Sequence, residues 1–287
     1  MALAKYVPVI TAGLFVALFL LERFFPLRRN RTPLLPGVLL NLAVSALAFL
    51  TALLAVKPSA LRTLEWSAKQ SFGLFHFVSL PSWLELILGF LLLDLSFYYW
   101  HLLNHKIPLL WRFHNVHHID PDLDVSTAFR FHFGEVLCST LFRAVQVGLL
   151  GMSFLTFFIY ELVFQANTLL HHSNLRLPIR LERLLNAIFV TPRMHGIHHS
   201  QVRPETNSNF GVVFCWWDRI HRTIGLNIPQ SQIEIGIPGY SLPQDNRLCH
   251  SLVLPFRRQR DYWSRPDGTV PARDANLLSP NPTRLAE

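Results

Sequence analysis

The chain has 287 residues, of which 51% are hydrophobic and only 15% are charged, a charged share well below that of a typical soluble domain. Its formal net charge is +8, but the basic residues flank apolar runs or lie in the C-terminal tail. This distribution indicates contact with a membrane surface and argues against nucleic-acid binding. The three cysteines form no CxxC or CxxCH motif, which disfavours a disulfide scaffold, a thiolate zinc site and a c-type haem.

Three apolar runs in the first third of the chain predict membrane-spanning helices. Each is close to the ~20 residues that a helix needs to cross a bilayer, and they cover residues 7–25, 34–56 and 84–103. The loop between the first two runs carries Arg28, Arg29 and Arg31, so the positive-inside rule places it in the cytoplasm. Residues 57–82 then lie on the far side of the membrane, and the third span runs back towards the cytoplasm.

Residues 136–170 form a further apolar stretch that is too long for one crossing. Gly148 and Gly151 lie near its middle, so we predict two short helices hinged at these glycines that enter and leave on the same side. The chain turns polar and proline-rich from Ser173 onwards. We expect residues 173–255 to form a cytoplasmic cap and the last residues to fray.

Histidines gather where these spans reach the cytoplasm. Helical spacing places the members of each group on neighbouring positions of one helix; the groups are His101 and His105, then His114, His117 and His118, then the doublet His171 and His172, and then His195, His198 and His199. Imidazole is a common ligand of zinc, iron and copper, and these groups offer more nitrogens than one structural zinc needs. A dinuclear centre with neutral ligands stays strongly positive, which suits binding and reduction of O₂ by electrons from a partner.

Two other functions remain open on the histidines alone. A metal-dependent hydrolase acting on lipid head groups would usually add a carboxylate ligand and a glutamate base, and no HExxH motif occurs. A histidine-rich metal carrier or sensor is the non-enzymatic alternative. A transporter would place its ligands near the bilayer midplane, whereas these histidines lie at span ends and in the cap, which favours catalysis.

Asp94 is an ionisable residue inside the third predicted span. It lies seven residues before His101, on the same helical face. Because a charge within a span usually has a partner or a role, we interpret Asp94 either as an acceptor that orients a ligand imidazole or as a polar contact between helices.

The histidine motifs resemble the three ordered boxes of the fatty acid hydroxylase / sterol desaturase superfamily, over roughly residues 90–225. The boxes are His101-x3-His105, His114-x2-His117-His118 and His195-x2-His198-His199. The surrounding segments agree; they are Pro108–His114, Phe129–His132, His172-Ser173-Asn174, Thr191–His195, Asn209-Phe210-Gly211 and Trp217-Asp218. The resemblance implies an integral-membrane, non-haem di-iron oxygenase that hydroxylates or desaturates a lipid, such as a sterol-like or fatty-acyl substrate.

The resemblance also implies a set of metal ligands, although the sequence departs from the family pattern beside His132. Nine histidines would bind two iron ions, with zinc as an alternative occupant: His101, His105, His114, His117, His118, His172, His195, His198 and His199. His171 is a weaker ligand, because His172 rather than His171 begins the HSN pattern. The family often has Pro after the RFH stretch, whereas Phe133 follows His132 here, so His132 is either a further ligand or a residue that supports one.

The sequence therefore predicts an all-α integral membrane bundle of four to five spans with a cytoplasmic, histidine-rich catalytic cap. We expect an N-terminal hairpin with an extracytoplasmic segment in residues 1–82, the catalytic domain in 83–255 and a flexible tail in 256–287. The partners would be O₂, a lipid guided by apolar residues such as Phe97, Leu102, Phe129 and Phe164, and a separate electron donor. That donor would be cytochrome b5-like or a ferredoxin with its reductase, because no fused HPGG haem motif is present.

Overall fold

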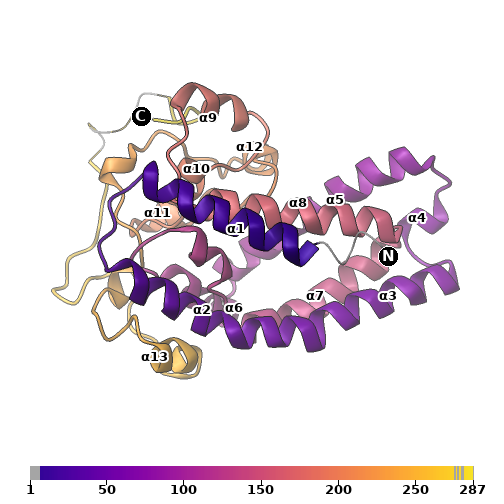
Figure 1. Cartoon of the computed structure of the whole chain (residues 1–287), viewed down its shortest axis with the longest axis horizontal. Coiled ribbons are helices and arrows are strands. Elements are labelled where there is room, and N and C mark those ends of the chain that lie inside the picture. The colour runs from indigo at the N-terminus through magenta and orange to yellow at the C-terminus, as the bar shows by residue number, and fades with distance from the viewer. Residues whose placement is uncertain (1–6, 275, 277, 279–280, 287) are drawn as a thin grey trace.

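Long helices form a bundle at one end of the molecule, and short helices and loops form a cap at the other end (Figure 1). The computed structural model describes residues 7–274, 276, 278 and 281–286. In that part of the chain the only β-structure is three isolated bridges. Among the described residues, four helices are long and apolar enough to cross a membrane; they lie within Val7–Phe24, Leu34–Phe77, Ser82–Lys106 and Phe133–Leu150. The predicted all-α membrane bundle is confirmed.

The helices follow one another with short connections. The bundle contains α1 (Val7–Phe24), α2 (Leu34–Thr51), α3 (Lys57–Gln70), α4 (Leu74–Phe77), α5 (Ser82–Lys106), α7 (Phe133–Leu150) and α8 (Phe154–His172). The cap contains α6 (Pro108–His118), α9 (Ile179–Leu185), α10 (Pro192–His198), α11 (Arg203–Thr206), α12 (Trp216–His221) and α13 (Leu248–Val253).

The arginine-rich loop between α1 and α2 lies at the cap end of the bundle. The backbone N–H of Leu27 donates to the carbonyl of Asn174 at 2.7 Å, and the N–H of Arg31 donates to Asp122 at 2.7 Å. The loop and the histidine-bearing segments are therefore on the same side of the bundle, as the span order requires. That this side is cytoplasmic stays a prediction.

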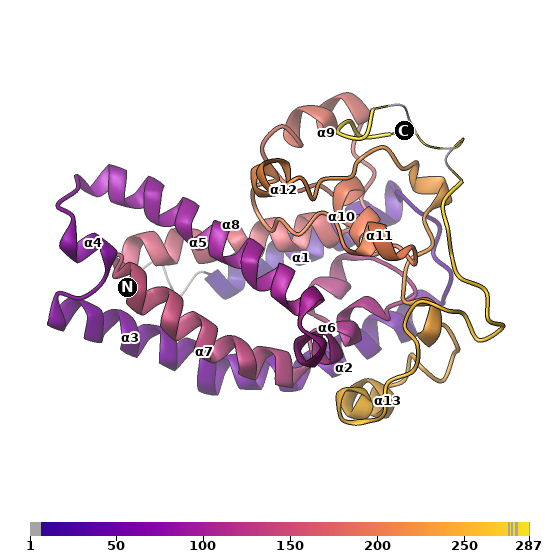
Figure 2. The same ribbon diagram turned by 180° about the vertical axis from the view of Figure 1, so that it is seen from behind.

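The helix that carries the second predicted span, residues 34–56, continues beyond Val56, and where the span ends stays a prediction. The helix continues from α2 through α3 to Gln70, because residues Ala52–Val56 form one wide π-helical turn in which the N–H of Lys57 donates to the carbonyl of Ala52. Pro58 has no N–H and would clash with a carbonyl in a regular helix, and a π-turn is a common way to absorb such a defect. Residues 57–70 consequently pack along α7 (Figure 2).

The hinge expected in residues 136–170 lies at Gly151. This glycine ends α7 with a left-handed φ of 61°, a conformation that glycine adopts without strain. A Cβ at this position would lie 2.5 Å from the carbonyl oxygen of Phe72. The glycine therefore lets α7 turn back into α8 while the α3–α4 loop packs closely against the turn, and the two helices form the predicted hairpin.

The predicted C-terminal tail makes defined contacts with the cap. Arg273 forms an ion pair with Glu205 at 2.8 Å, and the N–H of Ala286 donates to the carbonyl of Leu226 at 3.0 Å. Leu285 is only 2% exposed and packs in a small core with Val190 and Met194. The described residues of this segment thus lie along the cap, and the flexibility of the segment stays a prediction.

Candidate metal centre

Four segments, α5, α6, α8 and α10, carry the histidines to the cap end of the bundle. The first pair, His101 and His105, lies in the last turns of α5. Ile107 is extended and Pro108 starts α6, where proline is favoured because the first helical N–H needs no partner. This break reorients the chain, so that α6 brings its three histidines back over the end of α5. Pro192 starts α10 in the same way and positions the last box opposite.

The structure gathers nine histidines into two groups. In each group the ligand nitrogens all lie within 4.8 Å of one another, and most of the side chains are buried. The first group contains His101, His105, His114, His118 and His198, and the second contains His117, His172, His195 and His199. These are the nine residues that the sequence resemblance implied as metal ligands. Whether they bind metal is the subject of the proposal below.

Several imidazoles are fixed by hydrogen bonds from the nitrogen that points away from the group. Nδ1 of His101 lies 2.9 Å from the carbonyl of Phe210, that of His172 lies 2.8 Å from the carbonyl of Thr168, and that of His198 lies 2.7 Å from the carbonyl of Ser208. A carbonyl only accepts, so Nδ1 carries the proton and Nε2 keeps its lone pair. This arrangement is typical of histidines that bind a metal through Nε2.

The inward-pointing nitrogens approach one another closely. Nε2 of His172 lies 3.1 Å from Nε2 of His117 and 3.0 Å from that of His195. In the first group, Nε2 of His114 and of His118 are 3.2 Å apart. Ligands at about 2.1 Å from one metal ion, arranged at right angles, are separated by about 3.0 Å. The residues present therefore fit a metal ion in each group.

The electrostatics of the two groups favour the form that binds metal. Burial, followed by the neighbouring histidines, lowers the pKa of His117, His118, His195 and His199 well below the usual value. The rings are therefore neutral, which is the form that ligates a metal. Nε2 of His198 and of His105 is buried and has no hydrogen-bond partner within the described residues, and a cation would satisfy both.

Asp94 holds a backbone loop and makes no hydrogen bond to an imidazole among the described contacts. Its carboxylate accepts from the N–H groups of Val213 and Phe214 at 3.2 and 3.0 Å, and from the indole of Trp217 at 2.8 Å. The hydroxyl of Tyr160 lies 3.4 Å away. The direct contact with a ligand imidazole expected for Asp94 is therefore not found, and its role is to position the segment that carries Phe210.

Two acidic residues that support the histidines were not predicted from the sequence. Glu135, in the first turn of α7, accepts from Nδ1 of His114 at 2.9 Å. Asp218 accepts from the N–H groups of Phe210 and Gly211 at 2.8 and 2.7 Å, and so fixes the carbonyl that binds His101. Burial raises the pKa of Asp218 to about 6. Asp218 lies in the Trp217-Asp218 segment of the resemblance, which was the one available signal.

His132 and His171 belong to neither group. Nδ1 of His132 accepts from the N–H of Gly134 at 2.9 Å, so that it caps α7, and its Nε2 lies 3.1 Å from the carbonyl of Leu252. The His171 ring packs against the second group with its centroid 4.2 Å from that of His195. Its Nδ1 contacts the Asn167 amide at 3.3 Å. Ligation or support of a ligand by His132, and ligation by His171, stay predictions.

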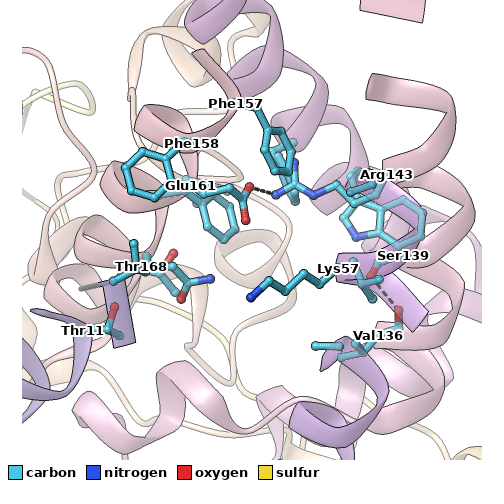
Figure 3. A pocket seen from close by; sticks show the side chains of 18 of the residues that line it. Thr11, Lys57, Val136, Ser139, Arg143, Phe157, Phe158, Glu161 and Thr168 are labelled. Carbon is cyan, nitrogen blue, oxygen red and sulfur yellow. Dashed lines mark hydrogen bonds and ion pairs between the residues drawn. The ribbon is translucent and has the colours of Figure 1, made fainter. Parts of the chain in front are cut away.

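A cavity of about 1700 Å³ leads from the histidines into the bundle, between the α2–α3 helix, α5, α7 and α8. His101, His114 and His172 line its inner end. Further along, phenylalanines from α8 line it together with a few polar side chains (Figure 3). Of the four apolar residues expected to guide a lipid, Phe97, Phe129 and Phe164 line the cavity and Leu102 does not.

Residues 86–223 match the family described as fatty acid hydroxylase. They include every histidine of both groups. The match to this family thus covers the histidine end of the cavity.

Similar proteins include three lipid-modifying enzymes. Ornithine lipid hydroxylase OlsE of Rhizobium tropici is 33% identical over 159 residues, 55% of this chain and 47% of that protein. Cholesterol 25-hydroxylase of Mus musculus is 30% identical over 155 residues, 53% of this chain and 51% of that protein. Alkylglycerol monooxygenase of Homo sapiens is 27% identical over 146 residues, 50% of this chain and 30% of that protein. The matched segment thus covers about half or less of each relative, and no solved structure matches significantly.

Proposed function

We propose that this protein is a membrane-bound, O₂-dependent di-iron oxygenase that hydroxylates a lipid. One observation carries the proposal: two largely buried groups of histidines lie side by side where a long, largely apolar cavity meets the cap. The relatives act as hydroxylases or a monooxygenase on an ornithine lipid, cholesterol and an alkylglycerol. This supports hydroxylation over desaturation, and an oxidoreductase over the hydrolase and carrier alternatives.

Two iron ions would be held by the nine histidines, five around one ion and four around the other. When bound, such an iron pair supplies the capacity to activate O₂ for attack on an unactivated C–H bond. His171 would remain outside the ligand set, because its Nδ1 contacts the Asn167 amide. His132 would support the start of α7, and with it Glu135, which orients His114.

The protein's own contribution is binding, orientation and exclusion of water. The apolar wall formed by Phe97, Phe129 and Phe164 would hold a lipid by burial, at about 0.8 kcal/mol for each methylene. A lipid fixed along the cavity would present one C–H bond to the histidine end, which supplies much of the advantage of an intramolecular reaction. The cap above the histidines would keep bulk water away from the reacting carbon.

The electrons would come from a separate donor, cytochrome b5-like or a ferredoxin with its reductase. We propose that the cap faces the cytoplasm, where such donors are found. The arginine-rich loop at the cap end supports this orientation through the positive-inside rule.

Metal analysis and isotope labelling test the proposal. Purified protein from iron-replete cells should hold close to two irons per chain. His101→Ala and His172→Ala, one from each group, should each lower the iron content and abolish turnover, whereas His250→Ala, outside both groups, should change neither. Membranes supplied with a reductase system and ¹⁸O₂ should yield a lipid product that carries one labelled oxygen. Label from water, or one zinc per chain without iron, would contradict the proposal.

A further inference from the structure

Lys57 places a positive charge on the wall of the cavity, and its side chain keeps substantial solvent exposure. It is the first residue of α3, directly after the π-turn in the continuous Leu34–Phe77 helix. Its side chain extends into the cavity (Figure 3). Within the described part of the chain, no hydrogen bond or ion pair joins its ammonium group. A charged group among the few polar groups of a largely apolar pocket can fix the orientation of a ligand.

The other charged side chains near this level already have partners. Arg143 forms an ion pair with Glu161 and donates to Gln146 at 2.7 Å. Its guanidinium also lies over the ring of Phe97, 4.3 Å from the centroid. This ion pair is neutral as a unit, so it neither balances Lys57 nor competes with it for an anion.

Glu85 and Glu65 also line the cavity. Glu85 accepts from Ser153 and Thr156 at 2.8 and 2.9 Å. Glu65 lies eight residues beyond Lys57 on the same helix, about 12 Å further from the histidines at 1.5 Å per residue. That distance is too long for a direct ion pair, so the ammonium of Lys57 remains available to a ligand.

Helix geometry gives the distance from Lys57 to the metal centre. Ser45, twelve residues before Lys57, donates to the carbonyl of Phe129 at 2.6 Å, close to where Phe131 stacks on His117. Twelve residues correspond to about 18 Å along the helix. On the opposite wall, Glu161 precedes His172 by eleven residues of α8, about 16 Å along that helix. Lys57, Glu161 and His172 line the same cavity.

We propose that Lys57 binds the anionic head of a single-chain amphiphile, such as a long-chain carboxylate, and thereby determines which carbon is oxidised. An extended saturated chain advances about 1.25 Å per carbon, from its bond length and angle. A head group at Lys57 therefore places a carbon about 13–14 positions away at the histidine end. The choice of carbon rests on the proposed oxygenase function, whereas binding of the anion at Lys57 does not.

Direct binding tests the head-group contact without turnover. The probe is radiolabelled eicosanoate with iron-loaded protein in phosphatidylcholine nanodiscs. Lys57→Leu should weaken binding about 10- to 100-fold, the range for a charge-assisted hydrogen bond. Lys57→Arg should keep most of the affinity. Lys69→Leu, on the same helix but outside the cavity lining, is the matched control and should bind as the unmodified protein does.

Competing ligands identify the chemistry that is recognised. Unlabelled eicosanoate should displace the probe far better than 1-eicosanol. Equal displacement by eicosyl phosphate would widen the proposal to anions in general. Equal displacement by eicosylamine would overturn it and point to Glu65 instead. Unchanged eicosanoate binding by Lys57→Leu would also overturn it.

Moving the cation tests its control of the oxidised position. Leu61 also lines the cavity and lies one turn further from the histidines, about 6 Å along the helix. The double variant Lys57→Leu, Leu61→Lys should therefore regain binding and oxidise eicosanoate about five carbons further from the carboxylate. An unshifted product would overturn control by Lys57. If no variant oxidises any lipid but binding still follows the lysine, the oxygenase proposal fails and the anion site stands.

Discussion

Removal of the Asp94 carboxylate should destabilise the protein strongly and loosen the first histidine group. In Asp94→Ala the N–H groups of Val213 and Phe214 and the indole of Trp217 lose their acceptor. A buried donor left without a partner costs about 1–3 kcal/mol, and because such neighbouring losses are not additive we expect ~3–6 kcal/mol in total. The melting temperature should fall by roughly 6–24 °C, at about 2–4 °C per kcal/mol for a chain of this size.

A graded series separates this mechanism from a general disturbance of α5. Tyr160→Phe removes only the 3.4 Å contact and should cost about 0.5–1.5 kcal/mol. Asp94→Asn keeps one acceptor oxygen and should fall between the two. The assay is thermal unfolding of purified protein in detergent, together with iron content. If Asp94→Ala melts within 2 °C of the unmodified protein, or if Tyr160→Phe is as damaging, the loop-anchoring argument is refuted.

Two further predictions concern the hairpin and the topology. Gly151→Ala should destabilise the protein by roughly 2–4 kcal/mol through left-handed strain and overpacking. Gly148→Ala, whose Cβ would meet only the Thr63 methyl at 3.2 Å, should cost less, and equal losses in thermal unfolding would contradict the Gly151 argument. In a background lacking the exposed native Cys249, single cysteines at Gln70 and Asp267 should react with an impermeant thiol reagent from opposite sides of the membrane. Labelling of both from one side would disprove the predicted orientation.

The sequence was sufficient for features that depend on composition and local spacing. The histidine boxes, the Gly151 turn and the placement of the clusters at one end of the bundle follow from apolar run lengths and from glycine's backbone freedom. The continuity of α2 and α3 could not be predicted in this way, because the Lys57-Pro58 pair is locally typical of a helix end. Only the neighbouring π-turn, stabilised by packing against α7, lets the helix continue.

Long-range hydrogen bonds could not be predicted from a single sequence either. Asp94 lies on the same helical face as His101, which suggested a direct contact with an imidazole. Its carboxylate oxygens instead accept from backbone N–H groups about 120 residues later. The same segment contains Phe210, whose carbonyl accepts from Nδ1 of His101. The coupling is therefore indirect, and it depends on how the cap folds back onto α5.

The division of the histidines into two groups follows from helix geometry and crosses the sequence boxes. In an HxxHH motif the first and last histidines differ by about 40° around the helix, whereas the middle one lies about 60° to the other side of the first. On α6, His114 and His118 accordingly enter the first group and His117 the second. On α10 the assignment is reversed, with His195 and His199 in the second group and His198 in the first. We therefore expect His198→Ala to lose the same iron as His101→Ala.

His117→Ala should likewise lose the same iron as His172→Ala, although His117 belongs to the box of His114 and His118. Mössbauer spectra of ⁵⁷Fe-loaded variants can distinguish the two sites, because five and four imidazoles give different coordination. Pairing by group would show that each ion is shared between segments far apart in the chain, so that a metal ion holds α6 and α10 together. Loss of one common iron in His114→Ala, His117→Ala and His118→Ala would instead mean that each box binds its own ion, and would refute the assignment.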